Sequence, residues 1–123
     1  MDTNTLGCVA EYSFATECLK LGYNVSFPLM DSSPYDCIVD TGERLLKIQV
    51  KSTKRKPTGY HKSVSASIIN ANGDYSKDNV DYFAIWTEYF NGFFIVKNKG
   101  NMRFIRLSTH GIYKDFFNNF AFE

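Results

Sequence analysis

Hydrophobic residues near the N-terminus recur at spacings of three or four, which is the period of an amphipathic helix. The apolar stripe consists of Leu6, Ala10, Phe14, Cys18 and Leu21. The polar run Thr3-Asn4-Thr5 precedes this stripe and Gly22 follows it, and such residues are typical of the two ends of a helix. The pattern therefore predicts a first helix that begins after the polar cap region and ends at Gly22.

Polar and apolar residues alternate in two later segments, which predicts a β-hairpin. The segments are residues 35–40 and residues 45–52. A two-residue loop between them would set Asp36 opposite Lys47, and a four-residue loop would set it opposite Gln49. The two registers differ by two residues, so both leave Asp36, Gln49 and Lys51 on a common face of the hairpin.

The rest of the chain predicts more strands and a second helix. Further strands are expected at residues 23–27, where Pro28 ends the run, and at 82–86, 93–97 and 103–107. Residues 64–69 are expected to form a strand or an irregular edge segment. A basic loop is expected at 54–61, a turn-rich linker at 70–78, a turn at 91–92 and a terminal helix within 109–120. Together the elements predict one domain over residues 1–123, of the α/β class, with a mixed sheet flanked by helices.

Composition adds a constraint on how the chain would meet a nucleic acid. With 44% hydrophobic and 22% charged residues the chain is an ordinary globule, and its net charge of +1 provides no overall basic field. Basic residues are nevertheless clustered directly after the hairpin. Lys54, Arg55, Lys56 and Lys62 lie in a stretch without acidic residues, and this clustering predicts contacts to phosphates.

The sequence predicts a cytoplasmic protein. No apolar run reaches the length of a membrane span, and the N-terminus lacks the basic and hydrophobic regions of a secretion signal. The three cysteines, Cys8, Cys18 and Cys37, include no C-x-x-C pair. An odd number of cysteines without such a pair favours a reducing compartment and argues against a zinc site.

Candidate chemistry lies on the common face of the hairpin. Asp36, Gln49 and Lys51 place an acid, an amide and a lysine side by side, a set that suits a divalent metal ion and an activated water. Alone, the polar face of residues 45–52 is typical of a solvated strand, and Glu11 of an exposed helical residue. Taken together, the four residues are better explained as an active site.

The order of these residues resembles a known family. A helix with Glu11, then Pro34-Tyr35-Asp36, then Gln49-x-Lys51 is similar to the PD-(D/E)XK nuclease superfamily, which has the restriction-endonuclease-like fold. The similarity is greatest to the branch with group I intron homing endonucleases and archaeal-type junction resolvases. It covers roughly residues 5–53 well and the strand at 80–84 more loosely. The sequence departs from the family pattern at Gln49, where an Asp or Glu is usual.

The resemblance implies metal-dependent hydrolysis of phosphodiester bonds in double-stranded DNA. It makes Glu11, Asp36, Gln49 and Lys51 the catalytic set. The metal ligands that the resemblance implies are Asp36, the Gln49 side chain, the Val50 carbonyl and Glu11. They would bind Mg²⁺, for which Mn²⁺ can substitute, and Lys51 would orient the attacking water. Because one small domain supplies one site and a duplex has two strands, we expect a homodimer or a homotetramer.

Two alternatives stay open at this point. The same nuclease could act on branched DNA, as Holliday junction resolvases do. The chain could instead be a DNA-binding module whose nuclease site has decayed, which the amide of Gln49 in place of an acid suggests.

Overall fold

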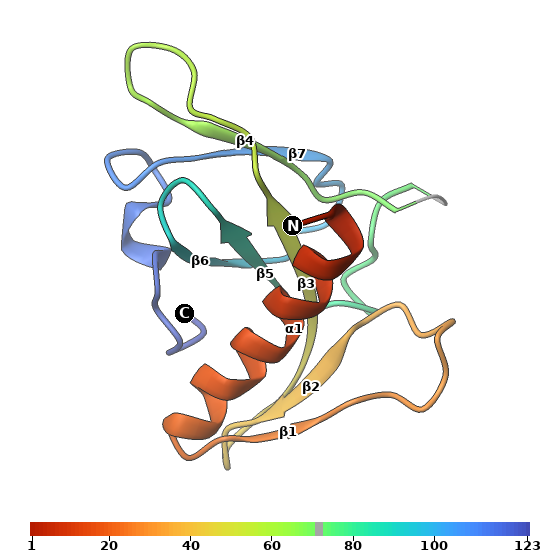
Figure 1. The fold of residues 1–123 in the computed structure, drawn as a ribbon. Coiled ribbons are helices and arrows are strands. Elements are labelled where there is room, and N and C mark those ends of the chain that lie inside the picture. Colours follow the sequence, from red (N-terminus) through yellow and green to blue (C-terminus); the bar gives the residue numbers. More distant parts are fainter. Residues whose placement is uncertain (71–72) are drawn as a thin grey trace.

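The N-terminal stripe forms a long helix that lies across a mixed β-sheet (Figure 1). These elements are taken from a computed structural model, which describes residues 1–70 and 73–123. The helix is α1 (Thr3–Lys20). The other elements are β1 (Asn24–Ser26), β2 (Cys37–Asp40), β3 (Leu45–Thr53), β4 (Val64–Ser67), β5 (Tyr82–Thr87), β6 (Gly92–Lys97), β7 (Phe104–Leu107) and the short 3₁₀-helix η1 (Lys114–Phe116). The expected α/β class with a mixed sheet is confirmed.

The ends of α1 differ in detail from the prediction. The cap is Asp2, whose carboxylate accepts a hydrogen bond from the Thr5 amide at 2.7 Å, so residues 3–5 lie inside the helix. Gly22 follows the helix with a φ of 86°, a conformation that suits glycine. Leu21 is exposed and does not extend the buried stripe. Within the described residues no helix is both long and apolar enough to span a bilayer.

The main sheet has the strand order β1-β2-β3-β5-β6. Strands β3 and β5 run parallel, and the other neighbours are antiparallel. Strand β2 pairs with β3 only as far as Ile48, whereas β5 pairs with β3 from Ile48 to Thr53. The second half of β3 therefore extends beyond β2 and leaves that edge open.

Strands β4 and β7 form a separate antiparallel pair, which we call the ribbon. The chain reaches β4 from β3 through residues 54–63, which we call the finger. Figure 1 shows the finger projecting from the molecule beyond the ribbon. The expected basic loop corresponds to this finger, which carries one bridge of its own between Thr58 and Ser63.

Two apolar cores lie on the two faces of the main sheet. The helix-side core includes Phe14, Ile48, Val50, Ile95 and Phe122. The ribbon-side core includes Ile68, Phe83, Ile85, Phe94 and Leu107. Successive residues of β5 and β6 alternate between the cores, so both faces of these strands are covered. Cys18 and Cys37 belong to the helix-side core, where burial raises the pKa of each thiol to about 12.

The predicted terminal helix is wrong. Only η1 forms there, because Phe117 adopts an extended conformation and Asn118 has a φ of 51°. The Asn118 amide donates to the Phe93 carbonyl at 2.6 Å, and Phe117 bridges to Phe94. Phe117 packs on the ribbon-side core and Phe120 on the helix-side core. Side chains on one face of a helix cannot pack on two cores that lie on opposite faces of the sheet. The tertiary packing of Phe117 and Phe120 therefore prevents the helix that their spacing predicts.

The remaining strand predictions are confirmed with small shifts in their bounds. Gly92 was expected in the turn but is the first residue of β6. The linker expected at 70–78 includes residues 71–72, which lie outside the described part of the chain. Tyr75 in this segment is buried and belongs to the ribbon-side core.

Two glycines should respond in opposite ways to a methyl group. A Cβ on Gly92 would lie within 3 Å of the Phe117 ring and of the Asn118 side-chain oxygen, whereas one on Gly7 in α1 would meet nothing within 4 Å. We expect Gly92→Ala to lower the free energy of unfolding by about 1–3 kcal/mol. Gly7→Ala should raise it by about 1 kcal/mol, because alanine favours helix. Urea denaturation of both variants measures this, and equal shifts would contradict the tail packing.

Candidate active site

Asp36 is held by two hydrogen bonds to β3, one on each side of Gln49. Its amide donates to the Ile48 carbonyl at 2.8 Å, and its carboxylate accepts from the Val50 amide at 2.8 Å. The hairpin pairs Asp40 with Leu45 and Cys37 with Ile48, which is the register of the four-residue loop. Asp36 therefore lies beside Gln49, where β2 leaves β3.

Glu11 approaches Asp36 from helix α1. Both side chains are only partly exposed. Burial, and after it the negative charge of Asp36, raises the pKa of Glu11. Burial also raises the pKa of Asp36, against the opposing effects of the Val50 hydrogen bond and then of the Lys51 charge. The two carboxylates are thus close enough to repel each other.

Lys51 acts on the same acid from the ribbon side of β3. Its ammonium group donates to the Ile69 carbonyl at 3.3 Å and lies 5.1 Å from the centre of the Tyr75 ring. These contacts hold the charge in place, and that charge lowers the pKa of Asp36. The contacts of Lys51 with Tyr75 and Ile69 could not be predicted from the sequence, because they join β3 to a segment without regular periodicity.

Gln49 and Val50 complete the group with uncharged oxygen atoms. The Gln49 side chain is half-buried, and within the described residues it has no hydrogen-bond partner. In an extended strand the amide and carbonyl of one residue face the same edge, so the Val50 carbonyl faces the edge where its amide meets Asp36. This carbonyl lies beyond the last pair of β2 with β3.

This donor set fits a hard divalent cation. Among the described residues the ion pairs are Lys20 with Glu17 and Arg103 with Asp74, so neither Glu11 nor Asp36 is paired with a basic group. No cluster of three or more His, Cys, Asp and Glu occurs in the same residues. Two carboxylates, an amide oxygen and a main-chain carbonyl are ligands that Mg²⁺ accepts together with several waters. A cation here would also relieve the repulsion between the two acids.

The other basic residues of this region do not converge on Asp36. Lys47 lies on the same face of β3 as Lys51, but its ammonium donates to the Asp78 carbonyl at 2.7 Å. Lys54 donates to the Met1 carbonyl at 2.9 Å, and Arg55 to the Ser65 hydroxyl at 3.4 Å. Lys56 and Lys62 are exposed along the finger.

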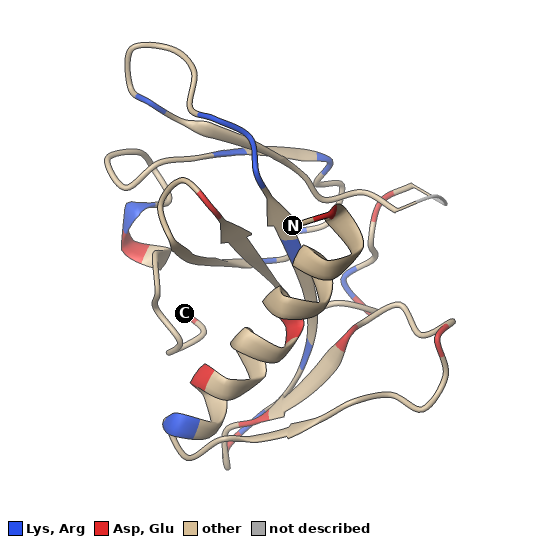
Figure 2. Ribbon diagram, viewed as in Figure 1, with Lys and Arg blue, Asp and Glu red and all other residues tan. Residues whose placement is uncertain are grey.

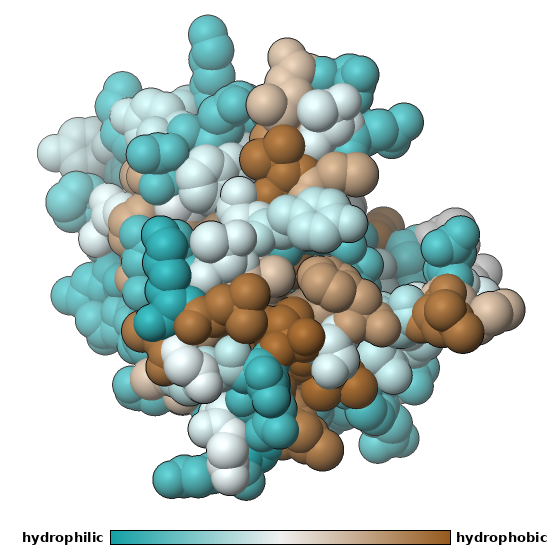
Figure 3. Space-filling model, turned by 60° about the horizontal axis from the view of Figure 1, so that its bottom comes forward, coloured by the Kyte–Doolittle hydropathy of each residue, from teal (hydrophilic) through white to brown (hydrophobic). Residues whose placement is uncertain are grey.

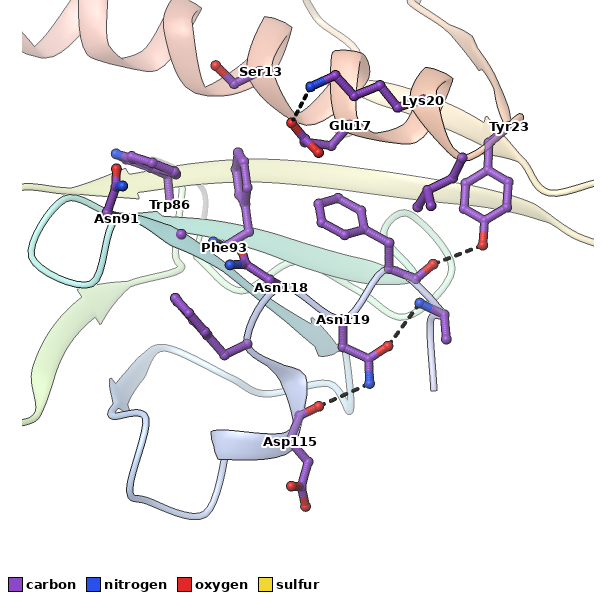
Figure 4. A pocket seen from close by; sticks show the side chains of 15 residues that line it. Ser13, Glu17, Lys20, Tyr23, Trp86, Asn91, Phe93, Asp115, Asn118 and Asn119 are labelled. Carbon is purple, nitrogen blue, oxygen red and sulfur yellow. Dashed lines mark hydrogen bonds and ion pairs between the residues drawn. The ribbon is translucent and has the colours of Figure 1, made fainter.

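A hollow of about 1030 Å³ lies away from these residues. Figure 4 shows it between the last turns of α1, the start of β6 and the C-terminal tail. Its polar side chains are largely paired within the protein. Lys20 contacts Glu17, Tyr23 donates to the Phe120 carbonyl, and Asn119 bonds within the tail. None of the four candidate site residues lines this hollow.

The fold is that of a restriction-endonuclease-like core, and within it Glu11, Gln49 and Lys51 lie around Asp36 at the open edge of β3. The chain belongs to the PD-(D/E)XK endonuclease family, whose sequence profile matches residues 1–111. The resemblance seen in the sequence is thereby confirmed. Nucleases of this family generally use divalent metal ions.

One solved structure shows the same fold over nearly the whole chain. It is the bacterial homing endonuclease I-Ssp6803I, which matches with a TM-score of 0.72 and 20% sequence identity, over 95% of this chain and 89% of that chain. No curated protein sequence gives a significant match.

The coupled acids predict a particular pH dependence of stability, measured with a chelator present. Glu11 and Asp36 have higher pKa values in the folded protein than in the unfolded chain, so the folded protein keeps their protons to higher pH. The free energy of unfolding therefore falls as pH rises from about 4 through these raised pKa values. Asp36→Asn keeps an acceptor for the Val50 amide but removes the charge. Its free energy of unfolding should exceed that of the parent by an amount that grows over this window and then levels off. A difference that is constant with pH would show that the two acids are fully solvated.

Proposed function

We propose that this protein is a Mg²⁺-dependent endonuclease that hydrolyses phosphodiester bonds in double-stranded DNA, with Glu11, Asp36, Gln49 and Lys51 as its active site. The observation that carries the proposal is the fixing of Asp36 between Ile48 and Val50, where its charge acts on Glu11 and the charge of Lys51 acts on it. Family membership supports the nuclease class. Mn²⁺ is the natural substitute, since it also accepts oxygen ligands.

Each residue has a distinct part in the reaction. Asp36 and Glu11 would bind the cation, with the Gln49 amide oxygen and the Val50 carbonyl completing the protein ligands. When bound, Mg²⁺ supplies Lewis acidity toward a phosphoryl oxygen. The ammonium group of Lys51 orients the attacking water and stabilises the negative charge that develops on the scissile phosphate. No side chain forms a covalent intermediate, so the reaction is direct hydrolysis.

The finger would hold the phosphate backbone beside this site. Strand β3 leads from Lys51 directly into Lys54, Arg55 and Lys56, so these charges follow the active site along the chain. Lys62 lies on the return arm of the finger. Contacts of this kind are independent of sequence and weaken as salt rises.

A symmetric dimer or tetramer would bring two active sites to the two strands of a duplex. Exposed apolar side chains supply a surface for self-association. Figure 3 shows apolar side chains gathered on the side of the molecule formed by α1, β1 and the following loop. Tyr12, Phe27, Leu29 and Met30 are exposed there, and the rings of Tyr12 and Phe27 are 5.8 Å apart. Such clusters are typical of protein interfaces.

Likeness to I-Ssp6803I favours a homing endonuclease as the biological role. Cleavage of branched DNA by the same site remains the alternative substrate. A four-way junction beside a linear duplex distinguishes the two, because a resolvase would cut the junction in preference.

Removing the acid or the lysine should abolish cleavage and spare binding. We expect Asp36→Ala and Lys51→Ala each to slow nicking of supercoiled DNA by about 10²-fold or more, because each removes charge stabilisation at the reacting phosphate. Lys47→Ala is the matched control, since it removes a lysine from the same face that bonds Asp78 instead. Gel-shift titration measures binding. Nicking by either variant within a few-fold of the parent would overturn the assignment.

Gln49 should set the metal requirement. Gln49→Glu adds an anionic oxygen at the same reach, so half-maximal cleavage should need less Mg²⁺, while the maximal rate stays level or falls as the new charge pairs with Lys51. Gln49→Leu keeps the bulk without the oxygen and should need more Mg²⁺. A parent that is inactive at every Mg²⁺ concentration would support the decayed site instead. Equal midpoints for all three proteins would exclude Gln49 as a ligand.

A further inference from the structure

Most of the positive charge of the chain lies in the two stretches that contain the ribbon strands. Residues 44–73 and residues 89–114 contain no Asp or Glu, and they hold seven and five basic residues, which leaves only Lys20 and Lys77 of the 14 outside them. The pairing of β4 with β7 brings these two stretches together. Figure 2 shows blue segments along the finger and the ribbon, while most red segments lie on α1 and around β1 and β2. A net charge of +1 therefore conceals a strongly basic side.

The ribbon has one buried face and one exposed face. Its inner residues Ala66, Ile105 and Leu107 belong to the ribbon-side core, which fixes the ribbon on the main sheet. Its outer face presents Ser65 opposite Arg106 and Ser67 opposite Phe104. Phe104 is 65% exposed although it is the largest apolar side chain of β7, and the residues opposite it are small and polar.

Arg106 is oriented by hydroxyl groups and is not neutralised by an acid. Its Nε and Nη2 donate to the Ser63 hydroxyl at 3.0 and 2.7 Å, and Nη2 also donates to the Thr58 hydroxyl at 2.8 Å. Within the described residues Arg106 has no ion pair, in contrast to Arg103, which contacts Asp74 at 3.0 Å. These bonds leave the two hydrogens of Nη1 for an acceptor outside the protein.

We infer that the outer face of the ribbon lies in the major groove of duplex DNA and reads base edges there, with Arg106 and Phe104 as specificity-determining residues. The major groove admits a two-stranded ribbon. Arginine donates to the O6 and N7 acceptors of guanine, and an exposed ring contacts the methyl group of thymine. The inference rests on the proposed nuclease function and assigns its sequence preference to a surface distinct from the phosphate-binding lysines.

The ribbon is rigidly joined to the active site. Lys51 contacts the Ile69 carbonyl just after β4, and the Thr53 hydroxyl donates to the Ser65 carbonyl at 3.4 Å. Four residue pairs of a ribbon extend over about 13 Å, which matches about four base pairs of duplex. The preferred bases should therefore form one short block at a fixed distance from each cut.

A pool of duplexes with a randomised segment tests this inference with two readouts. Sequencing of duplexes retained by the protein in a chelator gives the binding preference, and sequencing of the ends produced in Mg²⁺ gives the position of the cut. We expect the parent to show one block of about four preferred base pairs per site in both readouts.

Phe104→Ser and Arg106→Lys should each reduce the preference at one or two positions of that block by about tenfold and leave the others unchanged. Phe104→Ser changes an exposed side chain, so it tests the ribbon even if Arg106→Lys disturbs the finger. Arg103→Lys, just outside β7, is the matched control for Arg106→Lys, and Lys56→Ser controls for phosphate contacts. The first control should leave the preference unchanged, and the second should weaken binding to all sequences alike.

Different failures have different meanings. A parent that cuts without sequence preference, or variants that retain the whole preference, would overturn the inference and leave the nuclease proposal standing. A parent that never cuts would refute the nuclease proposal. In that case a binding preference altered by Phe104→Ser would still support the ribbon as the reading surface, and one unaltered by it would overturn that too.

Discussion

The candidate site depends on the hydrogen bonds of Asp36 to Ile48 and Val50, the two neighbours of Gln49. A hydrogen bond from its amide to Ile48 and one to its carboxylate from Val50 fix the acid at the point where β2 separates from β3. The same separation opens an edge of β3, so that Glu11 on α1 can approach Asp36. If the hairpin slipped by one residue, Asp36 would face the helix-side core, where a carboxylate has no partner.

The parallel pairing of β3 with β5 allows the candidate site to be assembled from both faces of the sheet. Because β5 covers the other edge of β3, the second half of β3 is held although β2 has ended. Its apolar residues pack under α1, and Lys51 faces the side that carries the ribbon. Glu11 thus comes from one face and Lys51 from the other, and they meet at the open edge. A site assembled from both faces depends on the packing of both cores.

The sequence predicted those elements in which each periodic set of side chains packs against one core or one face of the sheet. The stripe from Ala10 to Cys18 packs on one core, and the hairpin alternates between two faces of the sheet. The helix, the strands and the grouping of Asp36, Gln49 and Lys51 could therefore be predicted from residue spacing. The prediction of a terminal helix was wrong because Phe117 and Phe120 pack on opposite cores, which their helical spacing does not reveal. The pairing of β4 with β7 in the ribbon could not be predicted either, because the two strands are about 40 residues apart and their pairing is a long-range contact.

An amide at position 49 would balance two requirements of the proposed site, namely binding of the metal ion and stability of the folded protein. Burial raises the pKa of both Glu11 and Asp36, and the charge of Asp36 raises that of Glu11 further. A third acid at position 49 would lie directly beside Asp36 and add to that repulsion whenever no cation is bound. In the proposed site an amide would offer an oxygen to the same cation without a charge, so the folded protein would depend less on the metal for its stability. The expected consequence is weaker binding of the ion, which the Val50 carbonyl on the same edge would partly offset.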